Sequence, residues 1–273
     1  MDTRLDGLRA VVTAGAGGLG LAITRALVGE GATVFVGDVD ERALASLPSV
    51  VERAGVDVSD PGAVAAWLDP IAASGVDLLV NNAGIAGPTK PLEEISADEW
   101  RRCLAVGLDG QFHCARRVIP AMKRQQSGAI VNISSTAGFH GMPYRAPYVA
   151  AKFGVIGLTK TLAMELGRHG IRVNAVAPGA ITGERMDRVI AAHAEAEGLP
   201  REEIRSLYAE GTSMGTFVDP EEIADLVVFL ASARGKRISG QVISVDGHTE
   251  TLYPRTYDQS EKKRMGEQDG GRL

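Results

Sequence analysis

Tyr148 and Lys152 stand four residues apart in the segment PYVAAKFGV, and Ser135 lies thirteen residues before Tyr148. On a helix, residues i and i+4 share one face, so the phenol and the ammonium would be neighbours. A nearby cation stabilises the phenolate and lowers the pKa of the tyrosine. The Ser135 hydroxyl, from a separate loop, could hold a substrate oxygen beside that phenol. The three residues therefore predict a centre that moves a proton to or from a substrate.

A tyrosine and a lysine at this spacing are usually a solvated polar pair, so the interpretation depends on the rest of the chain. The 273 residues are 45% hydrophobic and 23% charged, with a formal charge of -5. This composition predicts one soluble domain with no basic surface for nucleic acid. Without a run of about 18 apolar residues or a signal sequence, we expect a cytoplasmic protein that does not span a membrane.

The cysteines and histidines show no spacing of metal ligands, and no metal is expected. Cys103 and Cys114 would lie on one helix about 16 Å apart, beyond the reach of a disulfide. They are predicted to be buried free thiols.

Apolar runs alternate with segments of helical periodicity along the chain. The expected strands are 8–14, 33–38, one ending near 57, 76–84, 128–134, 171–178 and 240–247. The expected helices are 19–29, 40–47, 61–73, 96–123, 148–168, most of 183–217, and one that begins at 219–222. Because the strands are continuous apolar runs, they predict a parallel sheet covered on both faces.

The expected domain is 1–253, and the remaining residues, 254–273, are polar with few apolar anchors. Such a tail cannot bury enough apolar surface to offset its ordering entropy, which predicts disorder. The alternative is that its first part packs over a neighbouring subunit.

The glycine-rich turn TAGAGGLG (13–20) follows the first expected strand and opens the first expected helix. Glycines there let the backbone approach a pyrophosphate, which the free N–H groups of the helix can bind. Asp38 ends the second expected strand, where a carboxylate can accept hydrogen bonds from ribose hydroxyls and repel a 2′-phosphate. The turn also contains no arginine, so the sequence favours NAD over NADP. The alternative is that Asp38 is only a turn residue at a strand end.

The glycine turn, NNAG at 81–84, and Ser135 with Tyr148-x-x-x-Lys152 occur in this order. Together they resemble the single-domain branch of the short-chain dehydrogenase/reductase family, from about residue 8 to 247. The resemblance implies a Rossmann-type doubly wound α/β domain with about seven parallel strands. It also implies an NAD(P)-dependent oxidoreductase acting on CH–OH groups, and a homotetramer that pairs its long helices.

The resemblance assigns roles to individual positions. Ser135 matches the catalytic serine, because its distance from Tyr148 selects it over Ser134. Tyr148 matches the acid/base tyrosine, and Lys152 matches the lysine that holds the nicotinamide ribose. The other positions matched to cofactor binding are Gly15, Gly17, Gly18, Leu19, Asp38, Val39, Asp57, Val58, Asn82, Ala83, Gly84, Pro178, Gly179, Ile181 and Thr182.

Three positions depart from the family pattern. Ala14 replaces a glycine, and its methyl is expected to fit if its backbone does not need positive φ. Gly107 replaces an asparagine that helps to hold a proton-relay water, so we expect a relay rewired through water or a neighbouring side chain. Gly183 replaces a threonine, and Thr182 is the expected substitute in the contact with the cofactor amide.

The segment 183–217 and the loop after Ser135 are expected to select the substrate. His140, Tyr144, Arg145 and Arg185 are its candidate contacts, and either arginine could pair with an anionic group. Their alternative is to be packed loop residues or solvated surface charges. These polar and charged side chains predict a small polar substrate, such as a polyol, a sugar or a hydroxy acid. The expected reaction is NAD-dependent oxidation of its secondary alcohol. An NADH-dependent carbonyl or 3-oxoacyl reductase and a non-catalytic cofactor-binding protein are the alternatives.

Overall fold

The computed structural model describes residues 3–250, which form a seven-stranded parallel sheet in the order β3-β2-β1-β4-β5-β6-β7. The strands are β1 Arg9–Thr13, β2 Thr33–Asp38, β3 Glu52–Gly55, β4 Leu78–Asn81, β5 Gly128–Ile133, β6 Ile171–Pro178 and β7 Val242–Val245. The predicted tail 254–273 lies outside the described residues.

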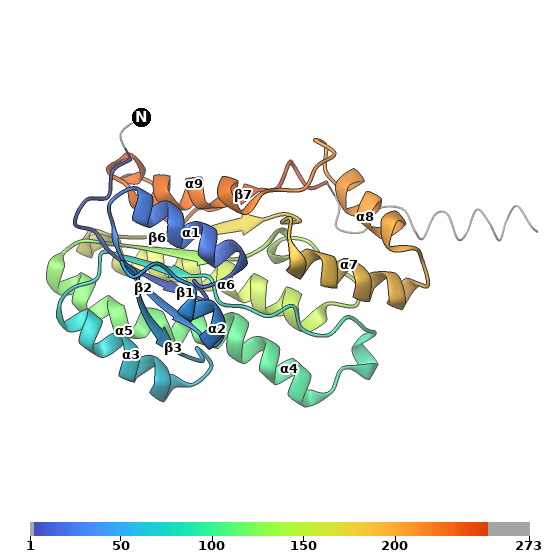
Figure 1. The fold of residues 1–273 in the computed structure, drawn as a ribbon, viewed down its shortest axis with the longest axis horizontal. Helices are drawn as coiled ribbons and strands as arrows, with labels where there is room; N and C mark the ends of the chain where they lie inside the picture. Colours follow the sequence, from blue (N-terminus) through green and yellow to red (C-terminus); the bar gives the residue numbers. More distant parts are fainter. Residues whose placement is uncertain (1–2, 251–273) are drawn as a thin grey trace, which may run out of the picture.

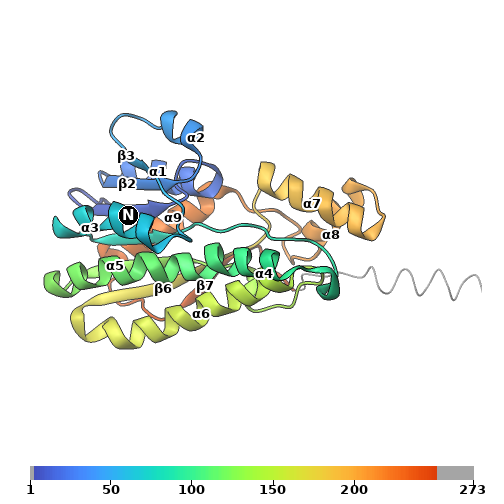
Figure 2. The same cartoon turned by 90° about the horizontal axis from the view of Figure 1, so that it is seen from below.

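Helices cover both faces of this sheet (Figures 1 and 2). The α-helices are α1 Gly18–Gly29, α2 Glu41–Ala45, α3 Pro61–Ala73, α4 Ala97–Leu104, α5 Gly110–Gln125, α6 Ala146–Leu166, α7 Glu184–Glu197, α8 Arg201–Glu210 and α9 Pro220–Ala231. The shorter helical turns are η1 Leu92–Glu94, η2 Ala105–Asp109, η3 Thr136–Gly138, η4 Gly167–His169 and η5 Ala233–Gly235. Helices α1 and α9 pack together on one face, and α3 packs against α5 on the other.

Alternate residues of each central strand feed two different cores. In β1, Ala10 and Val12 pack with the α1 and α9 side, whereas Val11 packs with the α3 and α5 side. All three side chains are fully buried, which explains why the strand reads as a continuous apolar run. The predicted fold class is therefore confirmed.

The helix expected over 96–123 is wrong as a single regular helix. It begins as predicted, at a capping box formed by Ser96 and Glu99, but the π-helical segment η2 separates α4 from α5. The backbone stays helical from α4 through η2 into α5, so the sequence gives no helix end between them. Gly107 lies inside this π segment.

The sheet reverses its strand order between β1 and β4. The chain runs outward from β1 to β3 and then returns to the other side of β1 to form β4. Loops at the carboxyl ends of two such strands diverge and leave a crevice, which is where ligands bind in this fold class. Helices α7 and α8 lie beyond that end of the sheet (Figures 1 and 2). Within residues 3–250, no helix has the length and apolarity needed to cross a bilayer.

Candidate active site

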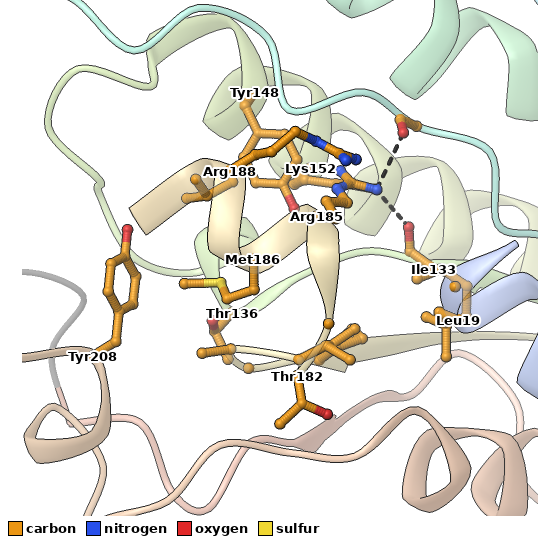
Figure 3. Close-up of a pocket in the computed structure, with 18 of the residues that line it drawn as sticks. Leu19, Ile133, Thr136, Tyr148, Lys152, Thr182, Arg185, Met186, Arg188 and Tyr208 are labelled. Atoms are coloured by element: carbon orange, nitrogen blue, oxygen red, sulfur yellow. Dashed lines mark hydrogen bonds between the residues drawn. The ribbon is translucent and has the colours of Figure 1, made fainter. Parts of the chain in front are cut away.

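The fold brings Ser135, Tyr148 and Lys152 together at the carboxyl end of β5. Tyr148 and Lys152 lie on α6, and the Lys152 Nζ atom is 5.7 Å from the centre of the Tyr148 ring. The same Nζ donates a hydrogen bond to the Ile133 carbonyl at 2.8 Å (Figure 3). The Ser135 hydroxyl lies in the loop just before η3 and acts on the Tyr148 phenol, whose pKa it helps to lower. Strand β5 and helix α6 therefore place the three groups that the sequence singled out.

The neighbouring Ser134 has a different environment. Its hydroxyl is buried and donates to the Lys152 carbonyl at 3.0 Å, so it fastens β5 to α6. Ser135 is partly exposed, and its hydroxyl oxygen accepts only a local bond from the Ala137 amide at 3.2 Å. Of the two serines, Ser135 is the one whose hydroxyl faces the phenol.

The surroundings of Tyr148 shift its proton affinity. Burial alone raises the pKa of the phenol, but Lys152, Arg185, the Ser135 hydroxyl and Arg145 together bring the pKa below its ordinary value. Burial also lowers the pKa of Lys152, which the tyrosine partly offsets. A phenol whose pKa is lowered by nearby cations is suited to accept a proton from an alcohol.

The glycine turn after β1 forms an open cradle at the start of α1. Gly17 is the N-cap residue of α1 and no side chain caps the helix, so the first N–H groups are free for a ligand. Gly17, Gly18 and Leu19 line a cavity of about 630 Å³ that reaches Tyr148. A Cβ on Gly20 would stand 1.9 Å from the Ala14 carbonyl oxygen, so only glycine fits there. This cradle fits a pyrophosphate group of a dinucleotide.

The expectation for Ala14 is wrong. Its φ is +50°, in the left-handed region that L-residues with a side chain rarely adopt. The Ala14 amide donates to the Gly37 carbonyl at 2.6 Å, and its carbonyl accepts from the Asn82 side chain at 3.0 Å. These bonds hold a conformation that the methyl group disfavours.

Asp38 stabilises the same turn through hydrogen bonds to its backbone. One carboxylate oxygen accepts from the Ala16 amide at 3.0 Å and the other from the Asp40 amide at 3.1 Å. The residue is 9% exposed at the end of β2. Asp38 is thus a brace for the turn as well as a negative charge next to it.

The NNAG turn after β4 ties the two sides of the crevice together. The Asn82 side chain donates to the carbonyls of Thr13 and Ala14, and the Thr13 hydroxyl accepts from the amides of Asn82 and Ala83. Gly84 lies beside Lys152: a Cβ there would be 3.6 Å from Nζ. The cross-links fix how far apart β1 and β4 can stand.

The other predicted cofactor positions divide into two groups. Those that line the cavity are Asn82, Gly84, Tyr148, Lys152, Pro178, Gly179, Ile181 and Thr182. Those outside the lining are Gly15, Asp38, Val39, Asp57, Val58 and Ala83. Gly15 instead packs against Val36 and Thr24, and the Asp57 carboxylate is bound by Ser59 and Arg102. The Thr182 hydroxyl donates to Asp219 at 2.8 Å, so toward a ligand it can act only as an acceptor.

Helices α7 and α8 close the other side of the cavity (Figure 3). They are joined by a small core of their own, built on Ile190, Ala194 and Ile204. Arg185 reaches from α7 across the cavity, and its Nη1 donates to the Gly84 carbonyl at 3.2 Å. Further lining side chains from this segment are Met186, Arg188, Val189, His193, Leu207, Tyr208 and Thr212.

Of the four predicted substrate contacts, Arg145 and Arg185 line the cavity, whereas His140 and Tyr144 do not. His140 instead packs edge-on against Phe139. Sequence reasoning missed His193, whose Nδ1 lies 3.3 Å from the Tyr208 hydroxyl. Its only signal was its place in a polar helical segment, which gives no direction toward the cavity.

Gly107 packs against the helix that carries Lys152. It faces α6, where a Cβ would stand 3.3 Å from the Ala151 Cβ, one residue from Lys152. Gln111, one helical turn later, is buried and donates to the Ile133 carbonyl at 3.3 Å, the same oxygen that binds Lys152. Gln111 is a second residue that sequence reasoning missed.

Both predicted thiols are free and buried in the structure. Burial raises the pKa of Cys114 to about 12. The pKa of Cys103 is also raised by burial, although Arg145, Lys152 and Arg185 lower it in part. Neither is suited to act as a nucleophile.

Comparison with known proteins identifies the family of the chain. A family model described as enoyl-(acyl carrier protein) reductase matches residues 14–248. The chain is 37% identical to a 3-oxoacyl-(acyl-carrier-protein) reductase of Thermotoga maritima, over 89% of this chain and 98% of that protein. It is 39% identical to a cis-4-hydroxycyclohexanecarboxylate dehydrogenase of Sinomonas cyclohexanicum, over 87% of this chain and 94% of the relative.

Among solved structures, an NAD⁺-bound xylitol dehydrogenase superposes with a TM-score of 0.85 at 29% identity, covering 89% of this chain and 98% of that one. The chain is therefore a member of the short-chain dehydrogenase/reductase family, a family of oxidoreductases that act on alcohols and ketones.

Proposed function

We propose that this protein oxidises a secondary alcohol of a small polar substrate to a carbonyl compound, with NAD as the cofactor. The observation that carries the proposal is Tyr148 with Lys152 next to it in the cavity that the glycine cradle also lines, and with Ser135 lowering the pKa of the phenol. When bound in that cradle, a nicotinamide cofactor supplies the hydride acceptor. The cavity volume of about 630 Å³ is within the range of small-molecule and cofactor sites.

The chain's own residues would handle the proton and the orientation. Ser135 holds the substrate oxygen, which fixes its distance from the phenol. Tyr148, as phenolate, takes the hydroxyl proton, because Lys152 and its neighbouring cations favour the charged form. Lys152 can also bind a ribose hydroxyl, since its Nζ lies next to the Gly84 backbone.

The preference for NAD rests on Asp38. Its charge at the end of β2 would repel a 2′-phosphate, and the turn 13–20 has no arginine to offset that repulsion. The brace that Asp38 forms with the Ala16 amide does not remove its charge.

The alternative is reduction of a carbonyl compound, including a 3-oxoacyl group on a carrier. It is favoured by the likeness to the Thermotoga maritima reductase. The catalytic groups would serve either direction, with Tyr148 as the proton donor in reduction. The NAD preference favours oxidation, because NAD is the usual acceptor of oxidative metabolism.

Turnover with a panel of polyols, sugars and hydroxy acids tests the proposal, with NAD and NADP compared and Tyr148→Phe as the matched inactive variant. We expect NAD-dependent oxidation of at least one panel class and its loss in Tyr148→Phe. Turnover that is equal in Tyr148→Phe would show that the proton is taken elsewhere, and reduction of NADP alone would overturn the assigned cofactor.

A homotetramer is proposed as the assembled form. The outer surfaces of α5 and α6 expose Phe112, Phe153 and Met164, which are 47%, 47% and 87% exposed. Apolar residues of this size on two long helices fit an interface between copies. A measured mass of one chain in solution would contradict it.

A further inference from the structure

Arg145 is a buried cation with no carboxylate partner within residues 3–250. It is 4% exposed, it precedes α6 as the N-cap residue, and its guanidinium carbon lies 4.9 Å from the centre of the Tyr148 ring. Nη2 donates to the Ala86 carbonyl at 2.8 Å, but Nε has no hydrogen-bond partner. Burying a charge with an unused donor is costly unless a ligand completes it.

The wall opposite Tyr148 supplies neutral groups. Burial raises the pKa of Tyr208 to about 12, so it stays a neutral donor at pH 7. Burial lowers the pKa of His193, which favours its neutral form. Arg188 is largely exposed and pairs with Glu184 at 3.7 Å, while Arg185 is engaged with the Gly84 carbonyl. Besides Lys152, Arg145 is therefore the buried cation of this cavity, and its charge acts on both Tyr148 and Tyr208.

We propose that Arg145 binds a carboxylate of the substrate, which makes the substrate a short hydroxy acid. The inference rests on the proposed function, because the substrate hydroxyl must reach Tyr148 while its carboxylate reaches Arg145. The guanidinium stacks on the Tyr148 ring, so the hydroxyl and the carboxylate are only a few bonds apart. A guanidinium pairs more strongly with a carboxylate than with hydroxyls, which favours a hydroxy acid over a polyol or a sugar.

Racemic 3-hydroxybutyrate and its methyl ester, each with NAD, form the test pair, since they differ in one negative charge. We expect kcat/KM of the wild type to favour the acid by about 100-fold, in line with a desolvated charge pair. In Arg145→Met, kcat/KM for the acid should fall about 100-fold and that for the ester by less than about fivefold. Arg188→Met removes an exposed, already paired cation from the cavity mouth and should change the acid-to-ester ratio by less than about threefold.

A wild type that oxidises acid and ester equally, or an Arg145→Met variant that loses both equally, would overturn the carboxylate anchor. If Arg145→Met does not fold, inhibition of the wild type decides: butyrate should compete at least about tenfold more tightly than butyramide, and equal inhibition would refute the proposal. Oxidation of neutral polyols alone would refute carboxylate binding by Arg145, while the proposed oxidation of a secondary alcohol would still hold. No NAD-dependent oxidation of any panel member would instead remove the proposed function.

Lys152 shares its hydrogen-bond acceptor with a buried glutamine. The Ile133 carbonyl accepts from both Lys152 Nζ and Gln111 Nε2, and the Gln111 carbonyl accepts from the Asn81 side chain at 3.4 Å. The Oε1 atom of Gln111 and the Oδ1 atom of Asn81 are buried with no partner. Gln111 and Asn81 are only 2% and 1% exposed. The unpartnered Oε1 of Gln111 belongs to the amide that shares the Ile133 carbonyl with the Lys152 ammonium, and a buried acceptor without a partner is where an ordered water binds.

We infer that Gln111 positions a water that passes protons between Lys152 and solvent. The family resemblance gives this task to an asparagine at the position of Gly107, one helical turn earlier. The glutamine side chain is longer by one methylene, so from the next turn it still reaches the carbonyl that binds Lys152. Gln111 acts through the water and the lysine and is a positioning residue.

Gln111→Leu keeps the bulk and removes the amide. We expect kcat to fall about tenfold with the KM for NAD unchanged, and the solvent deuterium isotope effect on kcat to increase. Adding Gly107→Asn to Gln111→Leu should recover most of the lost kcat. The Asn81 side chain also donates to Asn132, which donates to Thr159, so Thr159→Val is the control at the far end of this buried network. It should lower stability without changing the isotope effect. Unchanged kcat and isotope effect in Gln111→Leu, or no recovery in the double variant, would overturn the inference.

Discussion

The two sides of the cavity are built differently. The cofactor side consists of backbone turns after β1 and β4, cross-linked through Thr13 and Asn82. The substrate side consists of long side chains from α7 and α8, which are held together by their own small core. A substitution in the turns of the cofactor side disturbs the strands that they connect. On the substrate side, a single side chain can be replaced without moving the backbone. This difference predicts that mutations on the cofactor side affect folding and binding together, while those on the substrate side affect selectivity.

The largest effect is expected for Gly20→Ala on the cofactor side. Its Cβ would stand 1.9 Å from the Ala14 carbonyl oxygen, so the free energy of unfolding should fall by at least about 3 kcal/mol. Denaturant unfolding measures this change. Gly17→Ala is the control, because a Cβ there meets open space, and it should change stability by less than about 1 kcal/mol while it weakens NAD binding. Equal stability of the two variants would show that the turn is not rigid.

Lys152→Met affects both sides, because the Lys152 Nζ atom lies beside Gly84 on the cofactor side and 5.7 Å from the centre of the Tyr148 ring. The loss of the cation should raise the pKa of the Tyr148 phenol, so the rise of oxidation rate with pH should move to higher pH. At neutral pH, kcat should fall about 100-fold or more. A pH–rate profile measures both. A profile that keeps its position would mean that Lys152 does not set the proton affinity of Tyr148.

Most of the cofactor side could be predicted from the sequence, whereas much of the substrate side could not. The glycine turn, the NNAG turn and the Tyr148 and Lys152 spacing were readable because each is a local requirement of backbone or helix geometry. Ala14 was misjudged because its positive φ comes from Gly37 and Asn82, which are distant in sequence. His193 and Gln111 were missed because only tertiary packing turns them toward the cavity or Lys152. On a helix without a clear apolar face, the direction in which a side chain points depends on the elements that pack against the helix. The local sequence does not show it.

A smaller effect is expected for Asp38→Asn, which removes the charge and replaces one of the two oxygens that accept from the Ala16 and Asp40 amides. The ratio of kcat/KM with NADP to that with NAD should rise about tenfold, because the repulsion of a 2′-phosphate is lost. Asp40→Asn is the matched control, since it removes a charge two residues away and preserves the α2 cap. If both variants shift the ratio equally, the general field of the protein and not Asp38 sets the preference.

The smallest effect is expected for Ala14→Gly. Relief of the left-handed backbone should outweigh the added freedom of glycine in the unfolded chain, for a net gain of about 0.5 kcal/mol. The midpoint of urea unfolding measures it. A loss of stability would mean that the Ala14 methyl is favourably packed in the turn.

The most direct test of the account is NADH binding and turnover in Tyr148→Phe. Since the cofactor side is made mainly of backbone, the Kd for NADH should stay within about threefold of the wild type. Since the phenol takes the substrate proton, kcat should fall about 1,000-fold. A kcat within tenfold of the wild type would contradict the assignment of Tyr148 as the acid/base group.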